Sequence, residues 1–280
     1  MSVHHSPLGQ STPYVQDYDA ALLFPIARAT NRAELKSAVR PAHGVDIWTA
    51  YELSWLNTKG KPVVAAATFV LPATSPHIIE SKSFKLYLNS FNQTRFASTD
   101  EVLSTLRHDL SQASGAPVDV TLHTQDTFAD MQMAEMVGDC LDELDIEITA
   151  YEPDAELLKD ACAARGTPAG ASSITETLVS HLLKSNCPVT SQPDWATLQI
   201  RYTGAPIDHE KLLRYIVSYR QHAGFHEHCV EQIFDDISRY CSPDALTVYA
   251  RYTRRGGLDI NPWRSTLDEA PEVNIRTARQ

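Results

Sequence analysis

A cysteine close to two prolines and an aspartate is the clearest candidate for chemistry in this sequence. Cys187 follows a predicted strand, and Asp194 comes seven positions later, where the next predicted strand begins. A thiol acts as a nucleophile only after it loses its proton, which a nearby carboxylate can accept and return. We therefore expect Cys187 to lie exposed at a strand end, with Asp194 across a short connection. The alternative is a small apolar cysteine that fills a gap, with Asp194 as a turn residue.

Alternating hydrophobic residues predict the strands that would hold these two residues, and a longer period predicts the helices. In the first half, the predicted order is strands 46–56 and 62–71, helices beginning at Ser81 and near Thr99, and strands 118–122 and 146–150. In the second half, the order is strands 175–185 and 195–203, helices beginning after Asp208 and near Phe225, strand 246–252, and a last strand after the turn 254–257. Both halves therefore have the order ββααββ.

The repeated order predicts two modules with a short boundary segment. We expect an N-terminal extension over residues 1–40, a first module over 41–155 and a second module, which carries Cys187, over 174–280. The polar stretch 153–173, rich in glycine, alanine and serine, separates them. Antiparallel modules of this kind leave exposed sheet edges, and pairing modules into a closed barrel would remove those edges.

Composition narrows the class of protein. The 280 residues include 24 Lys plus Arg and 35 Asp plus Glu, so the net charge of −11 argues against direct binding to nucleic acid. Five cysteines without regular spacing favour a reduced, cytoplasmic protein. The longest apolar run, Pro62 to Ala73, is too short to cross a bilayer, and the run Ala20 to Ala27 does not have the character of a signal peptide.

One stretch and several scattered residues together resemble a known family. These are the run Ile79-Glu80-Ser81-Lys82-Ser83-Phe84-Lys85-Leu86-Tyr87-Leu88-Asn89-Ser90-Phe91, with Cys187, Asp194, the pair His226-Glu227 and the run Tyr252 to Gly257. The chain resembles the long, two-module form of the NADPH-dependent 7-cyano-7-deazaguanine reductases, from about Tyr18 to Arg264. The resemblance implies an α+β fold of two tandem tunnelling-fold modules, with antiparallel sheets and helices on one face. It also implies a homodimer whose active sites lie where modules or subunits meet.

The resemblance further implies a reaction and roles for particular residues. That family reduces a nitrile to a primary amine with two NADPH molecules, in queuosine biosynthesis. Cys187 would form a covalent thioimidate with the nitrile carbon, and Asp194 would supply and recover protons. The implied contacts with the deazapurine substrate are Ile79, Glu80, Ser81, His226 and Glu227. The implied contacts with NADPH are Ser81, Lys82, Arg255 and Gly256, and no metal is expected.

Each implied role has an ordinary structural alternative. Glu227 favours the first turn of a helix because the positive end of the helix dipole lies there. The run 254–257 is typical of a solvated hairpin turn. The chain has no Gly-x-Gly sequence, so a Rossmann domain is not expected and NADPH would be held in another way.

Three other functions remain open at this point. A zinc-dependent tunnelling-fold enzyme of the cyclohydrolase or pterin type would use the run His226-Glu227-His228-Cys229, although His226 and His228 should point in different directions on a helix. A thiol hydrolase would use Cys187 with His226, but the sequence lacks the usual context of such sites. A non-catalytic module that binds a nucleobase would tolerate replacement of Cys187.

Overall fold

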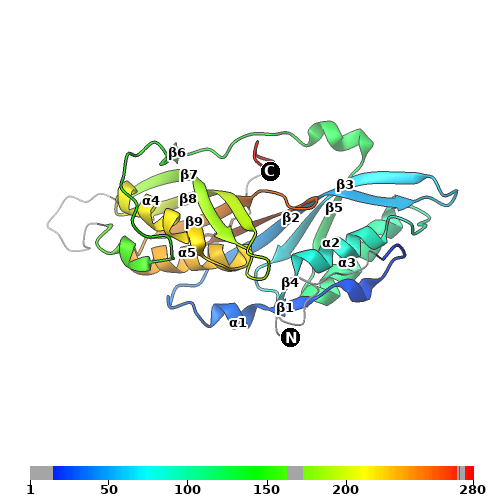
Figure 1. Ribbon diagram of the computed structural model, residues 1–280, viewed down its shortest axis with the longest axis horizontal. Helices are drawn as coiled ribbons and strands as arrows, with labels where there is room; N and C mark the ends of the chain where they lie inside the picture. Colours follow the sequence, from blue (N-terminus) through cyan, green and yellow to red (C-terminus); the bar gives the residue numbers. More distant parts are fainter. Residues whose placement is uncertain (1–14, 163–172, 270, 272–274) are drawn as a thin grey trace. The chain divides into compact units, whose positions relative to one another are not determined.

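The computed structural model describes residues 15–162, 173–269, 271 and 275–280 (Figure 1). The chain forms two compact units, each built from segments that are separate in the sequence. The first unit contains the residues up to Ala33, Val45–Gln132 and Arg254–Ile260, and the second contains Glu34–Gly44, Met133–Thr253 and Asn261–Gln280. The module boundaries expected from the sequence stay a prediction, and parts of them, residues 1–14 and 163–172, lie outside the described residues.

The first unit is a small sheet covered by two helices. Its elements are β1 (Pro25–Ala27), α1 (Arg28–Arg32), β2 (His43–Leu56), β3 (Pro62–Pro72), β4 (His77–Ile79), α2 (Ser81–Ser90), α3 (Thr99–Ser114) and β5 (Asp119–His123). The strands β2, β3 and β5 lie antiparallel in the order β5-β3-β2, while β1 pairs with β4. Alternate residues of the strands, such as Phe69 and Val120, form one core with Phe84 and Leu106 of the helices. The helices therefore cover one face of the sheet, as predicted.

The second unit repeats this arrangement with more strands. Its elements are β6 (Asp139–Cys140), β7 (Ile174–Asn186), β8 (Pro193–Gly204), α4 (His209–Ser218), α5 (His226–Tyr240), β9 (Ala245–Tyr252) and the part from Asn261 onwards of β10 (Leu258–Ser265). The order in space is β6-β7-β8-β9-β10, with β6 parallel to β7 and the other pairs antiparallel. Inward residues such as Leu198 and Val248 pack on Leu213 and Ile233 of the helices. The α+β class, the antiparallel sheets and the predicted ββααββ order of the second half are confirmed.

One sequence prediction about the first half is wrong. Residues 146–150 form no strand. Leu144 and Ile146 instead pack against the core of the second unit, where their apolar side chains are partly buried without a strand partner. The helix α2 begins at Ser81, as predicted, and its cap is Glu80, because the Glu80 carboxylate accepts the N–H groups of Lys82 and Ser83.

The first long strand of each unit contains a β-bulge. In β2 the register shifts between Ala50 and Leu53, and in β7 it shifts between Ser180 and Leu183. A bulge places two residues opposite one partner residue and leaves main-chain groups that other segments must satisfy. In the first unit, the N–H of Tyr51 donates to the main-chain oxygen of Gly257 over 2.9 Å. The bulges therefore attach distant segments to the two strands.

Candidate functional site

Cys187 lies directly after β7, as predicted, but it is buried. Only 4% of the residue is exposed, so the expectation of an exposed thiol at the strand end is wrong. The connection to β8 folds back on itself: the N–H of Cys187 donates to the oxygen of Gln192 over 2.9 Å, and the N–H of Ser191 donates to the oxygen of Cys187 over 3.0 Å. Ser191 takes a positive φ of 55° to make this turn. The main chain therefore makes a tight turn directly after the cysteine, which the spacing of two prolines alone did not reveal.

Asp194 lies on the neighbouring strand and faces a histidine. In the β7–β8 ladder it pairs with Ser185, two residues before the cysteine. Its Oδ2 atom is 3.4 Å from Nε2 of His226, the first residue of α5. Asp194 and Cys187 are each no more than 6% exposed. The structure thus brings a carboxylate and an imidazole together at the strand ends where Cys187 lies, in surroundings from which most water is excluded.

Tyr252, for which no separate role was predicted, positions this histidine. The rings of His226 and Tyr252 stack with centroids 3.8 Å apart and an angle of 5° between their planes. Tyr252 is fully buried near the end of β9. The alternation of Leu246, Val248, Ala250 and Tyr252 in the sequence indicated that the tyrosine points inward, but not that it would meet an imidazole.

A second cysteine lies close to these groups. Cys229 is fully buried on α5, and burial raises the pKa of its thiol to about 12. Hydrogen bonds to Ser185 and Tyr252 lower that pKa, while the charges of Asp194 and Glu227 raise it. Because a thiol with such a pKa stays protonated at neutral pH, Cys229 is a poor nucleophile.

The histidines around α5 do not converge on one point. His226 faces Asp194, whereas Nε2 of His228 is 3.2 Å from a carboxylate oxygen of Glu34. His222 lies before the helix, and burial together with repulsion from His228 lowers its pKa to about 4. The two helical histidines therefore point to different partners, as the helix geometry predicts, and the zinc-enzyme alternative finds no support here.

Glu227 occupies the first turn of α5 and is 4% exposed. The positive end of the helix dipole favours a negatively charged side chain in the first turn. It can accept two parallel N–H bonds from a planar ligand. The geometry therefore agrees both with the predicted contact to a guanine-like base and with a helix-stabilising role.

The remaining predicted substrate contacts lie in the first unit, where β4 meets α2. Ile79 and Glu80 are each no more than 2% exposed, whereas Ser81 is half-buried. Glu80 accepts from Lys82 N–H over 2.6 Å and from Ser83 N–H over 2.8 Å. Burial raises the pKa of the Glu80 carboxyl group, and these two N–H bonds oppose that shift. The carboxylate is thus held in place by the helix end.

The predicted NADPH contacts also belong to the first unit. Arg255 and Gly256 come late in the sequence, yet their turn is grouped with α2 and β2. A Cβ atom built on Gly256, which has φ 59°, would lie 1.5 Å from Nζ of Lys85, so this turn and the lysine approach closely. Burial lowers the pKa of Lys85; Glu52 opposes the shift, and the positive charges of Arg255 and Lys82 contribute to it.

The turn and α2 thus gather positive charge. Lys85 interacts electrostatically with Lys82 and Arg255, and also with the carboxylates of Glu52 and Glu80. Lys85 follows Lys82 by three positions, on the same side of the helix. Such a cluster suits phosphate groups, because fixed cations and close main-chain approach are what phosphate binding needs. No role was predicted for Lys85, although its spacing from Lys82 was the available signal.

A cavity of about 330 Å³ lies elsewhere in the second unit. It is lined by Ala134, Glu135, Met136, Val137, Thr177, Gln199, Arg201, Thr247, Tyr249, Arg251, Trp263, Glu269 and Ile275, and none of the predicted site residues is among them.

Within the part of the chain that the structure describes, no helix combines the length and the apolar character needed to cross a membrane.

Comparisons with known proteins agree with the sequence motifs. Residues 14–122 match the family described as "Nitrile reductase, 7-cyano-7-deazaguanine-reductase N-term", and residues 193–271 match the family described as "QueF-like protein". A protein of Bordetella pertussis is 58% identical over the full length of both chains, and one of Chromobacterium violaceum is 55% identical over the full length of both. Each is named "NADPH-dependent 7-cyano-7-deazaguanine reductase".

A further relative and a solved structure complete the comparison. A protein of Cupriavidus taiwanensis with the same name is 57% identical over 99% of this chain and 98% of its own. The apo structure of an archaeosine synthase QueF-Like has a TM-score of 0.31 and 16% identity, over 36% of this chain and 99% of that chain. On the family matches and the full-length identities, this chain belongs to the QueF family of nitrile reductases.

Proposed function

We propose that this chain is an NADPH-dependent enzyme that reduces the nitrile of 7-cyano-7-deazaguanine to the primary amine 7-aminomethyl-7-deazaguanine, in queuosine biosynthesis. The observation that carries the proposal is the group formed by Cys187, Asp194 and His226: a thiol directly after β7 and, on the paired strand β8, a carboxylate that lies 3.4 Å from an imidazole, all largely buried. Full-length relatives with more than half of their residues identical carry the corresponding enzyme name.

The thiol opens the reaction. The sulfur of Cys187 adds to the nitrile carbon and forms a C–S bond, while the nitrogen takes up a proton, so the product is a thioimidate and nothing leaves. This step changes a poor hydride acceptor into one that becomes strongly electrophilic once its nitrogen is protonated. Asp194 is suited to take the thiol proton and return it, because two neighbouring acids in a dry site share one proton.

Two reductions complete the conversion, and they need four electrons. NADPH, when bound, supplies a hydride in each of them. Loss of the sulfur after the first reduction leaves an imine, and Cys187 recovers its proton. His226 and Asp194 are the groups placed to protonate the nitrogen in both steps. The side chains of His226 and Asp194 are only 12% and 6% exposed, which limits the access of the water that would hydrolyse the imine.

Substrate recognition is assigned to Glu227, with His226 beside it. The carboxylate of Glu227 accepts two N–H groups from the guanine-like edge of the base, a match of two parallel hydrogen bonds. Ile79, Glu80 and Ser81 provide further contacts. We assign NADPH to Ser81, Lys82, Arg255 and Gly256, because this region combines positive charge with a glycine turn that permits close main-chain approach. We also propose that the enzyme is a cytoplasmic homodimer that makes no direct contact with nucleic acid.

Mass spectrometry tests the proposal. The protein is mixed with 7-cyano-7-deazaguanine without NADPH, and its mass should rise by the whole mass of the substrate, since addition to a nitrile expels nothing. Cys187→Ala should give neither the adduct nor turnover. Digestion should place the adduct on Cys187. An adduct on Cys229 or Cys241, or turnover that survives in Cys187→Ala, would overturn the assignment, and the latter result would favour a module that only binds the base.

A further inference from the structure

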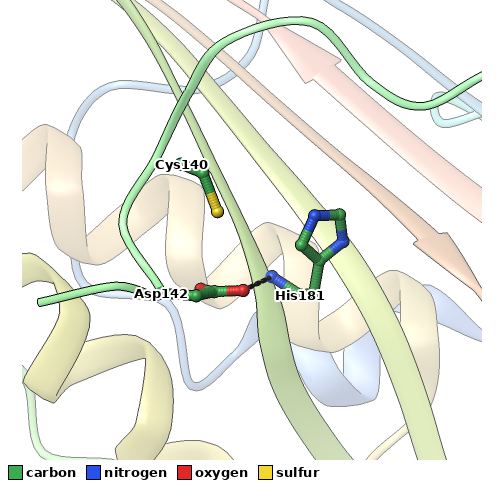
Figure 2. Close-up of side chains that lie close together, drawn as sticks. All are labelled: Cys140, Asp142 and His181. Atoms are coloured by element: carbon green, nitrogen blue, oxygen red, sulfur yellow. Dashed lines mark hydrogen bonds between the residues drawn. The ribbon is translucent and has the colours of Figure 1, made fainter.

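Three side chains suited to bind a metal ion converge at the edge of the second unit's sheet, among residues given no role above. Cys140 ends β6, Asp142 follows two positions later, and His181 lies in the adjacent strand β7. One ligand atom from each of these residues lies within 4.8 Å of those from the other two. Figure 2 shows the thiol, the carboxylate and the imidazole facing a common space.

The bulge in β7 explains why these residues meet. The register shift between Ser180 and Leu183 places His181 and its neighbour Leu182 opposite the single residue Thr197. Asp142 closes the bulge: its Oδ1 accepts from the Ser180 hydroxyl over 2.7 Å, and its Oδ2 accepts from the His181 N–H over 2.9 Å. The parallel pairing of Cys140 with Val179 then holds the thiol beside the same bulge.

The surrounding hydrogen bonds have the form expected around metal ligands. The Nδ1 atom of His181 lies 3.0 Å from the hydroxyl of Thr197, so when Nδ1 carries the proton, Nε2 presents its lone pair. Figure 2 shows one ring nitrogen on the side of the Cys140 sulfur. Ligating imidazoles and carboxylates are usually oriented by such second hydrogen bonds, which fix the tautomer and the direction of the lone pair.

The local charge favours a cation. The segment from Asp139 to Asp145 contains four carboxylate residues in seven positions. A positive group near the site, Arg279, donates to the main-chain oxygen of His181 over 2.7 Å and lies over the Trp195 ring at 5.5 Å from its centroid. Because the arginine is engaged with main chain and an aromatic ring, the acidic segment dominates the charge near the thiol.

We propose that Cys140, Asp142 and His181 bind one divalent transition-metal ion of the zinc type. Thiolate, imidazole and carboxylate are the ligands that zinc prefers, and a tetrahedral zinc site separates its ligand atoms by roughly 3.5 Å. The observed limit of 4.8 Å therefore asks for only a small side-chain movement, which the exposed Cys140 permits. Water fills the fourth position, and binding releases the thiol proton.

The ion would join the segment around β6 to the strand that leads to the catalytic thiol. His181 lies six residues before Cys187 in the same chain segment. Occupation of the site stabilises the native protein by mass action, because the unfolded chain does not hold the three ligands together. The site is not part of the proposed reduction, so its test does not depend on turnover.

Metal titration tests the proposal. Protein treated with a chelator and then freed of it is titrated with zinc by calorimetry, and cobalt(II) is added separately to record the sulfur-to-cobalt charge-transfer band. The parent should bind one ion per chain and melt at a higher temperature with zinc. Cys140→Ser, Asp142→Asn and His181→Gln should each weaken binding by about tenfold or more. Cys140→Ser should also remove the charge-transfer band.

Two matched variants test whether another cysteine binds the ion. Cys162→Ser removes another partly exposed thiol, and Cys187→Ala removes the proposed catalytic one; both should bind zinc as the parent does. Melting of each metal-free variant shows whether it folds. The proposal fails if the parent binds no ion, if Cys187→Ala abolishes binding, or if Asp142→Asn and His181→Gln bind as tightly as the parent, since Cys140 alone would then be an adventitious ligand.

Discussion

Nε2 of His226 lies 3.4 Å from the carboxylate of Asp194, while a face of the imidazole ring stacks on Tyr252 with nearly parallel ring planes. The stack fixes the direction in which Nε2 points, so the contact with Asp194 is built into the fold. A proton can move between the two groups without a large rearrangement. The pair should therefore act as one unit in the proposed reaction.

Asp194→Asn tests this unit. The substitution keeps the shape and removes the group that accepts a proton, so turnover should fall by about 100-fold or more while the melting temperature stays close to that of the parent. The double variant Asp194→Asn/His226→Gln should lose little more than the worse single variant, as residues that act together do. Unfolding of Asp194→Asn would show that the aspartate is structural, and additive losses would show that the two residues act separately.

Cys229 should be unreactive in the native protein. With a pKa of about 12, on the order of one thiol in ten thousand is ionised at pH 8, and the side chain is fully buried. Alkylation with iodoacetamide, followed by peptide mass spectrometry, should label the exposed Cys140 quickly and Cys229 only after denaturation. Labelling of Cys229 at a rate close to that of Cys140 would contradict the burial and the raised pKa.

Glu227→Gln should change the choice of heterocycle. The substitution turns one acceptor oxygen into a donor that faces the N–H groups of the base, so substrate binding should weaken by about 1–3 kcal/mol. NADPH binding should stay nearly unchanged when both are measured by calorimetry. Glu210→Gln is the matched control, because Glu210 occupies the first turn of α4 in an exposed position. Equal weakening of both ligands would argue for a general helix effect.

Lys82→Ala and Arg255→Ala should each raise the Michaelis constant for NADPH by about tenfold, because each removes one charged contact to phosphate. Thioimidate formation should remain, since that step comes before hydride transfer. The preference for NADPH over NADH should weaken as salt rises, because partly exposed charges are screened. The control is Lys59→Ala, in the exposed loop between β2 and β3. Parent-like kinetics in both variants would place the cofactor elsewhere.

Acid should destabilise the protein partly through His222. Burial and the neighbouring His228 lower its pKa from 6.5 to about 4, and Glu34 partly opposes this. The unfolded chain therefore binds more protons between these values, and the free energy of unfolding should decrease as pH falls from about 6.5 towards 4. In urea unfolding at several pH values, His222→Gln should show a shallower decrease than the parent, whereas the exposed His108→Gln should not. Parallel pH profiles for parent and His222→Gln would refute the assignment.

The sequence was sufficient for the local elements and for the order of the site residues. Alternation with a period of two predicted β7 and β8, and helical spacing with Asp208 as a cap predicted α4. These signals are local, because each depends on which face of a single strand or helix is apolar. The position of Cys187 after β7 and of His226 at the start of α5 followed directly from them.

Only the tertiary structure decided which of these residues meet. Cys187 is buried after a turn that Gln192 closes, and the contact between Asp194 and His226 depends on how α5 packs on its sheet. The turn at Arg255 joined α2, far away in the sequence, and the bulge at His181 brought in Cys140. Strand register, bulges and helix packing set such contacts. These features depend on partner segments that are far away in the sequence, and a local pattern of residue types does not record them.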